Sequence, residues 1–174
     1  MGLDFYVFIC YNKLEENVIR KKMEARELIK KVKFNLNCVN VKECPMLFDY
    51  AINLILEEWV EEGKRKQTRE KILNEASQET FVVLKNKMPV GCFVICKNDI
   101  KNRPELNPNL ACVCVEKKHR GKGYSLFILN ESKKKLQELG YKQAYLKTNL
   151  ENFYEKVGWV KIETDVESIY KIDL

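Results

Sequence analysis

Histidine and closely paired cysteines are almost absent from this chain. It has one histidine, His119, among 174 residues, and its seven cysteines include no Cys-x-x-Cys pair. Because zinc sites need Cys and His ligands clustered at short spacings, we expect no metal centre. Most of the cysteines lie in apolar, strand-like segments, where a free thiol acts as a small hydrophobic group. Such usage is typical of a reducing compartment, so we expect a cytoplasmic protein.

Long apolar runs are also missing. None reaches the roughly 18 residues that a membrane-spanning helix needs, so no membrane partner is expected. With 45% hydrophobic and 32% charged residues, the composition is typical of a globular domain. The net charge of +6 favours a polyanionic ligand only mildly. Few aromatic residues lie near the run Lys133–Lys135, so stacking on bases is poorly supported and nucleic acid is not the expected partner.

The chain divides into an N-terminal extension, residues 1–31, and one domain, residues 32–174. The extension is a short apolar run followed by a charged segment whose apolar residues recur at roughly helical spacing. We expect a helix attached to the domain, a mobile arm or an oligomer contact, and the last of these would make a homodimer.

The order of elements in residues 32–174 indicates the mixed α/β (α+β) class. Helices are expected over 45–62, 69–76, 123–139 and 151–156, with Gly63 and Gly140 ending the first and third. Strands are expected over 32–41, 81–84, 90–96, 110–115, 143–147, 159–162 and 168–172, and the strand 110–115 reads as buried on both faces. The order is neither a regular βαβ alternation nor all-β, so it indicates one central sheet with helices packed on it.

The segment from Val113 to Ser125 carries the clearest chemical signal. An apolar strand leads into a short basic loop with two glycines, and a helix follows at once. The first amides of a helix have no partner within it, and the helix dipole adds partial positive charge there. Glycines let the backbone approach a phosphate closely, and Arg120 and Lys122 add formal charge. The segment therefore predicts a phosphate cradle, although it is neither a Walker loop nor the dinucleotide fingerprint.

Two motifs resemble the GNAT superfamily of N-acetyltransferases. The stretch Arg120-Gly121-Lys122-Gly123-Tyr124-Ser125 resembles the Arg/Gln-x-x-Gly-x-Gly/Ala signature, with Ser125 where Gly or Ala is usual. Downstream, Tyr154-Glu155-Lys156-Val157-Gly158-Trp159 resembles the family's Tyr-Glu-Lys-x-Gly-Phe ending. The resemblance covers roughly residues 32–174. It implies a GNAT-like fold: a central, mostly antiparallel mixed sheet flanked by helices, with a strand-loop-helix pyrophosphate site.

The resemblance also implies an activity and a set of binding residues. The activity is direct transfer of acetyl from acetyl-CoA to an amine, such as a small amine or a protein N-terminus, without a metal. The strand before the cradle would pair with the pantetheine arm, and its splay from a neighbouring strand, often at a bulge, would admit the thioester. The residues expected to hold the cofactor are Val113, Cys114, Val115, Arg120, Gly121, Lys122, Gly123, Tyr124, Ser125 and either Asn149 or Asn152.

Catalytic roles follow from the same resemblance. Tyr154 would lie near the coenzyme A sulfur, where a phenol can protonate the departing thiolate or hydrogen-bond to it. The strand 110–115 carries no acid, so the base must come from elsewhere or from a water chain. The acidic residues that could lie near the acceptor are Glu57, Glu58, Glu79 and Glu116. Glu58 is preferred because it lies beside Trp59 on the first long helix, which borders the acceptor site in the superfamily.

Other chemistry is weaker in the sequence. Cys112 and Cys114 share one face of a strand, but a nucleophilic cysteine needs an activating base, and His119 reads as an exposed loop residue. A non-catalytic coenzyme A-binding regulatory domain stays open because the strand carboxylate is missing. A basic nucleic-acid-binding module is a third reading.

Overall fold

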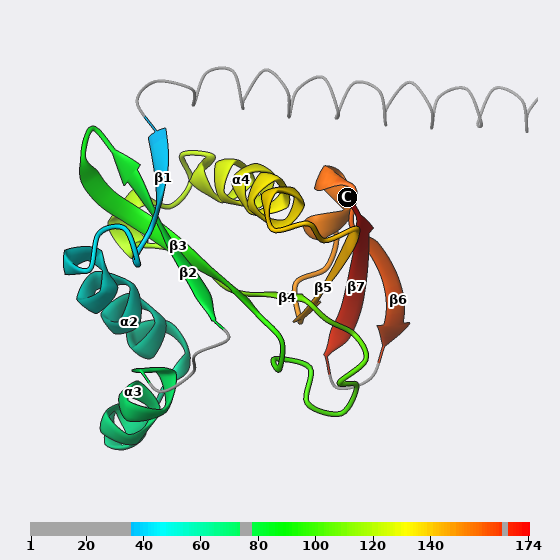
Figure 1. The fold of residues 1–174 in the computed structure, drawn as a ribbon, viewed down its shortest axis with the longest axis horizontal. Helices are drawn as coiled ribbons and strands as arrows, with labels where there is room; N and C mark the ends of the chain where they lie inside the picture. Colours follow the sequence, from blue (N-terminus) through cyan, green and yellow to red (C-terminus); the bar gives the residue numbers. More distant parts are fainter. Residues whose placement is uncertain (1–35, 74–77, 165–166) are drawn as a thin grey trace, which may run out of the picture.

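A computed structural model describes residues 36–73, 78–164 and 167–174 of the chain. The N-terminal extension predicted for residues 1–31 lies outside them. The described residues form a seven-stranded mixed sheet with helices on both of its faces, which confirms the mixed α/β class (Figure 1).

The sheet has the strand order β1-β2-β3-β4-β5-β7-β6. Neighbouring strands are antiparallel except β4 and β5, which run parallel. The strands are β1 Leu36–Asn40, β2 Glu79–Lys85, β3 Met88–Cys96, β4 Asn109–Val115, β5 Gln143–Thr148, β6 Val160–Thr164 and β7 Ser168–Asp173. The α-helices are α2 Met46–Trp59, α3 Arg65–Leu73 and α4 Tyr124–Glu138, and short 3-10 helices span η1 Glu62–Lys64, η2 Lys117–His119 and η3 Tyr154–Val157.

The helices around α2 and α3 and the turn η3 differ most from the sequence-based expectation. Helix α2 ends at Trp59 rather than near residue 62, because Val60 takes an extended backbone with φ −122°. Gly63 therefore lies inside η1 and does not cap α2. Helix α3 begins at Arg65, four residues before the predicted start, and the helix expected over 151–156 is the single 3-10 turn η3.

Each face of the sheet is covered by its own helix. On one face α4 packs through Tyr124, Ile128 and Leu136, which are spaced four and eight residues apart and therefore share one side of the helix. They belong to the larger core. On the other face α2 packs through Ala51 and Leu54 against β2, β3 and β4. Figure 1 shows α4 and the α2–α3 pair lying apart, with the sheet between them. Residues facing either helix therefore come from alternate positions along the strands.

Strand β4 carries a bulge in the middle of the sheet. Between the pairs Val94–Ala111 and Cys92–Cys114, strand β3 has one residue, Phe93. Strand β4 has two residues there, Cys112 and Val113. Cys112 has a φ of 51°, in the left-handed region. The expected bulge is thus present. The expectation that strand 110–115 is buried on both faces was wrong, since Cys112, Val113 and Val115 are only half-buried.

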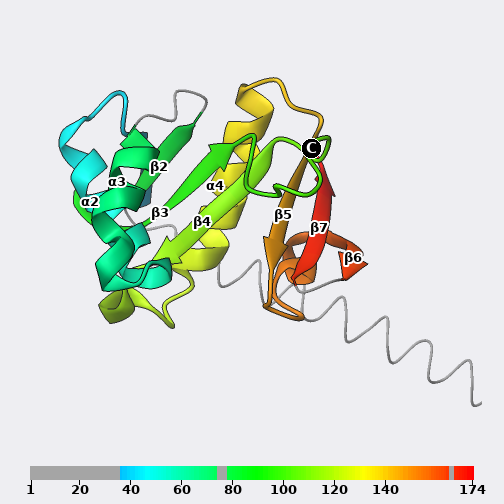
Figure 2. The same ribbon diagram turned by 90° about the horizontal axis from the view of Figure 1, so that it is seen from below.

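Strands β4 and β5 diverge from one end of the sheet to the other. Their register consists of Asn109 opposite Tyr145, at the beginning of β4, supported by the Tyr145 N–H donating to the carbonyl of Pro108 at 2.9 Å. Towards Val115 the two strands separate, as Figure 2 shows by the widening space between their ribbons. The bulge and the divergence lie on the same stretch of β4, and they open the sheet where the sequence predicted a splay.

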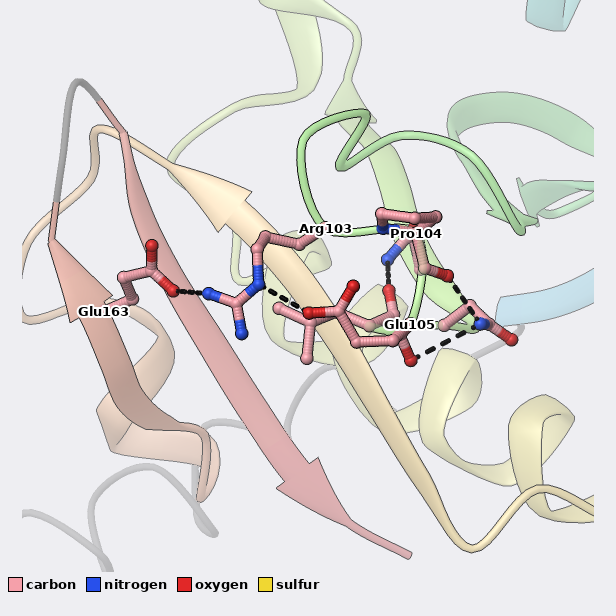
Figure 3. A network of polar contacts seen from close by, with 7 residues as sticks. Arg103, Pro104, Glu105 and Glu163 are labelled. Carbon is pink, nitrogen blue, oxygen red and sulfur yellow. Dashed lines mark hydrogen bonds and ion pairs between the residues drawn. The ribbon is translucent and has the colours of Figure 1, made fainter.

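The loop 97–108 closes the narrow end of this divergence. Ile100 and Leu106 pack on Tyr145 of β5 and Ile169 of β7. In Figure 3 the Arg103 side chain bridges Glu105 in the loop and Glu163 on β6. The loop is therefore fixed to the far edge of the sheet.

Within the described part of the chain, no helix combines the length and the apolar character that crossing a bilayer requires.

Candidate active site

A pocket of about 690 Å³ lies at the open end of the β4–β5 divergence. Its wall joins four separate segments: the end of α2, the bulged end of β4, the loop that begins α4, and the turn around η3. The predicted site residues in its wall are Glu58, Val113, Cys114, Val115, Arg120, Gly121, Gly123, Tyr124, Ser125 and Tyr154. The fold thus brings the two sequence motifs, about thirty residues apart, to one cavity.

The loop before α4 has the geometry of an anion cradle. Gly121 and Gly123 have φ values of 73° and 79°, a conformation that glycine adopts without the clash a β-carbon causes. Gly123 is the N-cap of α4 and provides no side-chain cap, so the first amides of the helix have no side-chain acceptor from their N-cap. Because Tyr124, Ser125 and Leu126 all line the pocket, these donors lie at its wall, where an anion would bind them.

Arg120 is held at the pocket wall by two acceptors. Its Nε donates to the Val115 carbonyl at 2.9 Å, and its Nη2 lies 2.6 Å from Oε1 of Glu58. Hydrogen bonding to Glu58 raises the pKa of Arg120 above its usual value. Glu58 is largely shielded, with 18% of its side chain exposed, and the Lys117 ammonium is 3.9 Å away. Helix α2 is therefore tied to the cradle through this ion pair.

Tyr154 lies at the pocket wall among other aromatic rings. It is 7% exposed and makes edge contacts with Phe153 and Trp159 at centroid distances of 5.1 and 6.3 Å. Burial raises the pKa of Tyr154 to about 12. The phenol therefore keeps its proton at neutral pH, and its hydroxyl can serve as a hydrogen-bond donor.

The two cysteines beside the bulge are poor nucleophiles. Both contact the core under α2, so they share a face as expected. Burial raises the pKa of Cys112 to about 12 and that of Cys114 to about 11. A reactive cysteine needs thiolate at neutral pH, and raised pKa values remove it. The geometry gives no support to a covalent acyl-enzyme.

A family model for the acetyltransferase (GNAT) domain matches residues 76–161. That range contains the bulged strand, the cradle and Tyr154. The chain contains a GNAT acetyltransferase domain. The family resemblance in the sequence motifs is thereby confirmed, and so is the GNAT-like fold.

Known proteins with similar sequence or fold agree with this assignment. N-alpha-acetyltransferase 30 from Schizosaccharomyces pombe is 29% identical over 87 residues, which are 47% of this chain and 57% of that protein. The match thus spans little more than half of the relative's length. An acyl-CoA N-acyltransferase from Pseudomonas aeruginosa superposes with a TM-score of 0.60 at 16% identity, covering 79% of this chain and 97% of the other. A GNAT acetyltransferase from Elizabethkingia anophelis, with acetyl-CoA bound, gives a TM-score of 0.58 at 15% identity, covering 82% and 100%. The two structures, both below 25% identity, show the fold alone.

Some residues proposed for the site of the GNAT domain lie outside the pocket wall. Lys122 turns back along the loop, and its ammonium donates to the Lys118 carbonyl at 3.0 Å. Asn149 and Asn152 are exposed in the turn between β5 and η3 and do not line the pocket. Their contact with a cofactor stays a prediction.

The other acidic candidates in the GNAT domain lie elsewhere. Glu57 is exposed beside Glu58, and Glu79 pairs with Asn40 and Lys42 at the start of β2. Glu116 is half-buried and accepts a hydrogen bond from the Tyr50 hydroxyl at 3.4 Å. Among these four, Glu58 alone lines the pocket.

Several pocket residues were not foreseen as part of the site. His119, expected to be an exposed loop residue, is half-buried and lines the pocket, so that expectation was wrong. The other unforeseen wall residues are Trp59, Leu126, Leu150, Phe153 and Lys156. Trp59 and Leu150 are 55% and 56% exposed, which leaves large apolar groups at the wall. Lys156 belongs to the second motif and Trp59 stands beside Glu58, so adjacency could have pointed to both, whereas Leu126, Leu150 and Phe153 carry no signal beyond their closeness to the motifs.

A search of the residues that the structure describes finds no group of three or more His, Cys, Asp or Glu side chains placed to hold a metal ion.

Proposed function

We propose that this chain is an acetyl-CoA-dependent N-acetyltransferase that transfers acetyl directly to an amine. The observation that carries the proposal is the single pocket in which the bulged strand β4, the Arg120–Ser125 cradle and Tyr154 meet. A phosphate cradle alone would suit many ligands. A cradle that continues into an opening between two strands, with a buried phenol at the pocket wall, suits a long ligand with a phosphate group and a reactive thioester.

Coenzyme A fits this arrangement in chemical terms. The first amides of α4 and the guanidinium of Arg120 would bind the pyrophosphate. Backbone groups of Val113 and Val115, which face the space between β4 and β5, would pair with the amides of the pantetheine arm. The Elizabethkingia relative of similar fold is named as binding acetyl-CoA, which supports the same ligand here.

The acyl group would then lie near the bulge. A bulge leaves one residue outside the regular ladder, which would leave a backbone N–H at Cys112 or Val113 without its usual strand partner. Such a donor can stabilise the negative charge that develops on the thioester oxygen during attack. The amine must arrive neutral, and Glu58 or a water chain would take its proton.

Tyr154 would assist the leaving thiolate through a hydrogen bond. A thiol in water has a pKa of about 8.5, whereas burial raises the pKa of Tyr154 to about 12. Full proton transfer from so weak an acid to the thiolate is therefore unfavourable. Hydrogen bonding without transfer carries no such penalty, and it is the role we assign to Tyr154.

The acceptor is an amine, and a polypeptide N-terminus is the class to test first. The Schizosaccharomyces pombe relative is named as an N-alpha-acetyltransferase. Small amines are the second class, because the motifs that hold coenzyme A do not select the acceptor.

The test has two stages. Calorimetric titration with coenzyme A should give saturable binding, and 3′,5′-ADP should compete for it. Purified protein with acetyl-CoA is then screened against peptides with free N-termini, the same peptides with blocked N-termini, and small amines, with released thiol as the readout. Thiol release that needs a free amine supports the enzyme. Coenzyme A binding with no transfer to any acceptor would favour the regulatory domain, and no binding would refute the proposal.

A further inference from the structure

The ion pair between Arg120 and Glu58 occupies one of the two edges through which the guanidinium could bind a pyrophosphate. A guanidinium binds a phosphate best through two parallel N–H groups on one edge. In Arg120 the edge formed by Nε and Nη2 is already used, Nε by the Val115 carbonyl at 2.9 Å and Nη2 by Glu58 at 2.6 Å. The cation that the cradle motif contributes is therefore satisfied by a carboxylate of the protein itself.

The local charges make this carboxylate a competitor of the cofactor. Glu58 lines the same pocket as Arg120 and the first turn of α4. A phosphate on the Nε–Nη2 edge would lie against Glu58, and two anions on one cation repel each other. Lys117, 3.9 Å from Glu58 with 75% of its side chain exposed, is too solvated to cancel that repulsion.

Because Glu58 lies at the pocket wall, its carboxylate has a second role once it is displaced from Arg120. Glu58 is the last glutamate of α2 before Trp59, and both lie on the pocket wall. A carboxylate that leaves Arg120 stays at this wall, because the helix holds its backbone. There it is the one acidic side chain among the described wall residues, and it can attract the ammonium form of an acceptor or take a proton from it.

We propose that Glu58 is a positioning residue that occupies Arg120 until coenzyme A binds, and that the pyrophosphate replaces it and frees the carboxylate for the acceptor amine. This inference rests on the proposed function. It makes the acceptor subsite complete only after the acyl donor is in place, so the amine is recognised second.

The test is a double-mutant cycle on coenzyme A affinity, measured by calorimetry on the full chain. Glu58→Gln keeps the shape of the side chain and removes its charge, so coenzyme A should bind about three- to tenfold tighter. Arg120→Gln should weaken binding. In the Arg120→Gln background, adding Glu58→Gln should tighten binding by a clearly smaller factor than in the wild-type background, because the cation for which the two anions compete is gone and only their direct repulsion is left.

Glu57→Gln is the matched control. It removes the same charge from the neighbouring position of α2, but Glu57 is exposed and outside the pocket, so coenzyme A affinity should stay at the wild-type value. Melting temperatures of all variants verify that each is folded.

The outcomes separate the two proposals. If wild-type protein binds coenzyme A but Glu58→Gln binds it equally or more weakly, the inference about Glu58 is wrong and the proposed function stands. The inference is likewise wrong, and the proposed function stands, if Glu57→Gln tightens binding as much as Glu58→Gln does, or if the gain from Glu58→Gln is undiminished in the Arg120→Gln background. If wild-type protein does not bind coenzyme A, both proposals fail.

Discussion

Replacing Gly91 by alanine should damage the sheet at the edge of the pocket. Gly91 lies on β3 opposite Val115, the last residue of β4. A β-carbon built at Gly91 would lie 2.4 Å from the backbone oxygen of Cys114, 3.0 Å from Cδ1 of Ile128 and 3.3 Å from Cα of Val115. Two of these three atoms belong to the backbone, so they cannot move aside by a change of rotamer. Strand β3 and the end of β4 must therefore separate.

The magnitude follows from these contacts. Overpacking a core costs about 1–3 kcal/mol, and the rigid backbone neighbour puts Gly91→Ala in the upper part of that range. Alanine regains about 0.5–1 kcal/mol through the smaller entropy of the unfolded chain. The net loss of about 1–2 kcal/mol corresponds to a melting temperature roughly 2–8 °C lower, since a domain of this size loses about 2–4 °C per kcal/mol. Coenzyme A affinity should fall as well, because Cys114 and Val115 line the pocket.

Gly63→Ala is the matched control for this experiment. Gly63 has no atom within 4 Å of its ideal β-carbon position and lies in the exposed turn η1. Its replacement should change the free energy of unfolding by less than about 0.5 kcal/mol. Thermal melting followed by circular dichroism, with calorimetric titration of coenzyme A, measures both effects. If the Gly91→Ala variant had the same melting temperature as the Gly63→Ala variant, the close-packing argument would be refuted.

Three further changes test the site itself. Gly123→Glu should abolish coenzyme A binding, whereas Gly123→Ala, which carries the same backbone strain at a φ of 79° without the charge, should retain part of it; calorimetry that finds the two equal would contradict the cradle. Tyr154→Phe should lower kcat about tenfold or more and leave KM for acetyl-CoA within about twofold, and steady-state kinetics with an unchanged kcat would remove the phenol from the mechanism. Because burial raises the pKa of Cys114 from 9.0 to about 11, its thiolate fraction falls about a hundredfold, so iodoacetamide at pH 7.5 should modify it far more slowly than after unfolding in urea; equal rates by mass spectrometry would show that the thiol is not shielded.

The sequence predicted most of the elements because their signals are local. Amphipathic spacing marked α2, glycines marked both ends of α4, and two β-rich runs joined by a turn marked the hairpin of β2 and β3. Gly140 indeed has a φ of 85°, and the Tyr141 N–H donates back to the Leu136 carbonyl at 3.1 Å. The end of α2 was misplaced because Val60, with no local signal, takes the extended conformation that stops the helix.

The sequence predicted those parts of the site in which a motif requires a particular backbone conformation. It did not predict the other parts. Gly121 and Gly123 were expected in the cradle, and both have the positive φ that explains why glycine stands there. The ion pair of Glu58 with Arg120 was not foreseen, since it joins residues 62 positions apart that only the packing of α2 on the sheet brings together. The half-buried state of His119 likewise depends on Tyr124, whose ring centroid is 6.3 Å away.

Three departures from a regular sheet coincide at one place in this fold. Cys112 has a φ of 51° although it carries a β-carbon, β4 has an additional residue opposite Phe93, and Gly91 leaves no room for a side chain beside Cys114. Each is unfavourable for stability by itself: a left-handed residue other than glycine costs about 1–3 kcal/mol, a bulge interrupts the ladder, and glycine weakens a strand. Strands β3 and β5, the neighbours of β4, would form a more regular sheet with an unbulged β4. The departures lie in or beside the end of β4 whose residues Val113, Cys114 and Val115 line the pocket, and such local violations persist where a site needs them. Their coincidence is therefore an argument for a ligand between β4 and β5 that is independent of the two sequence motifs.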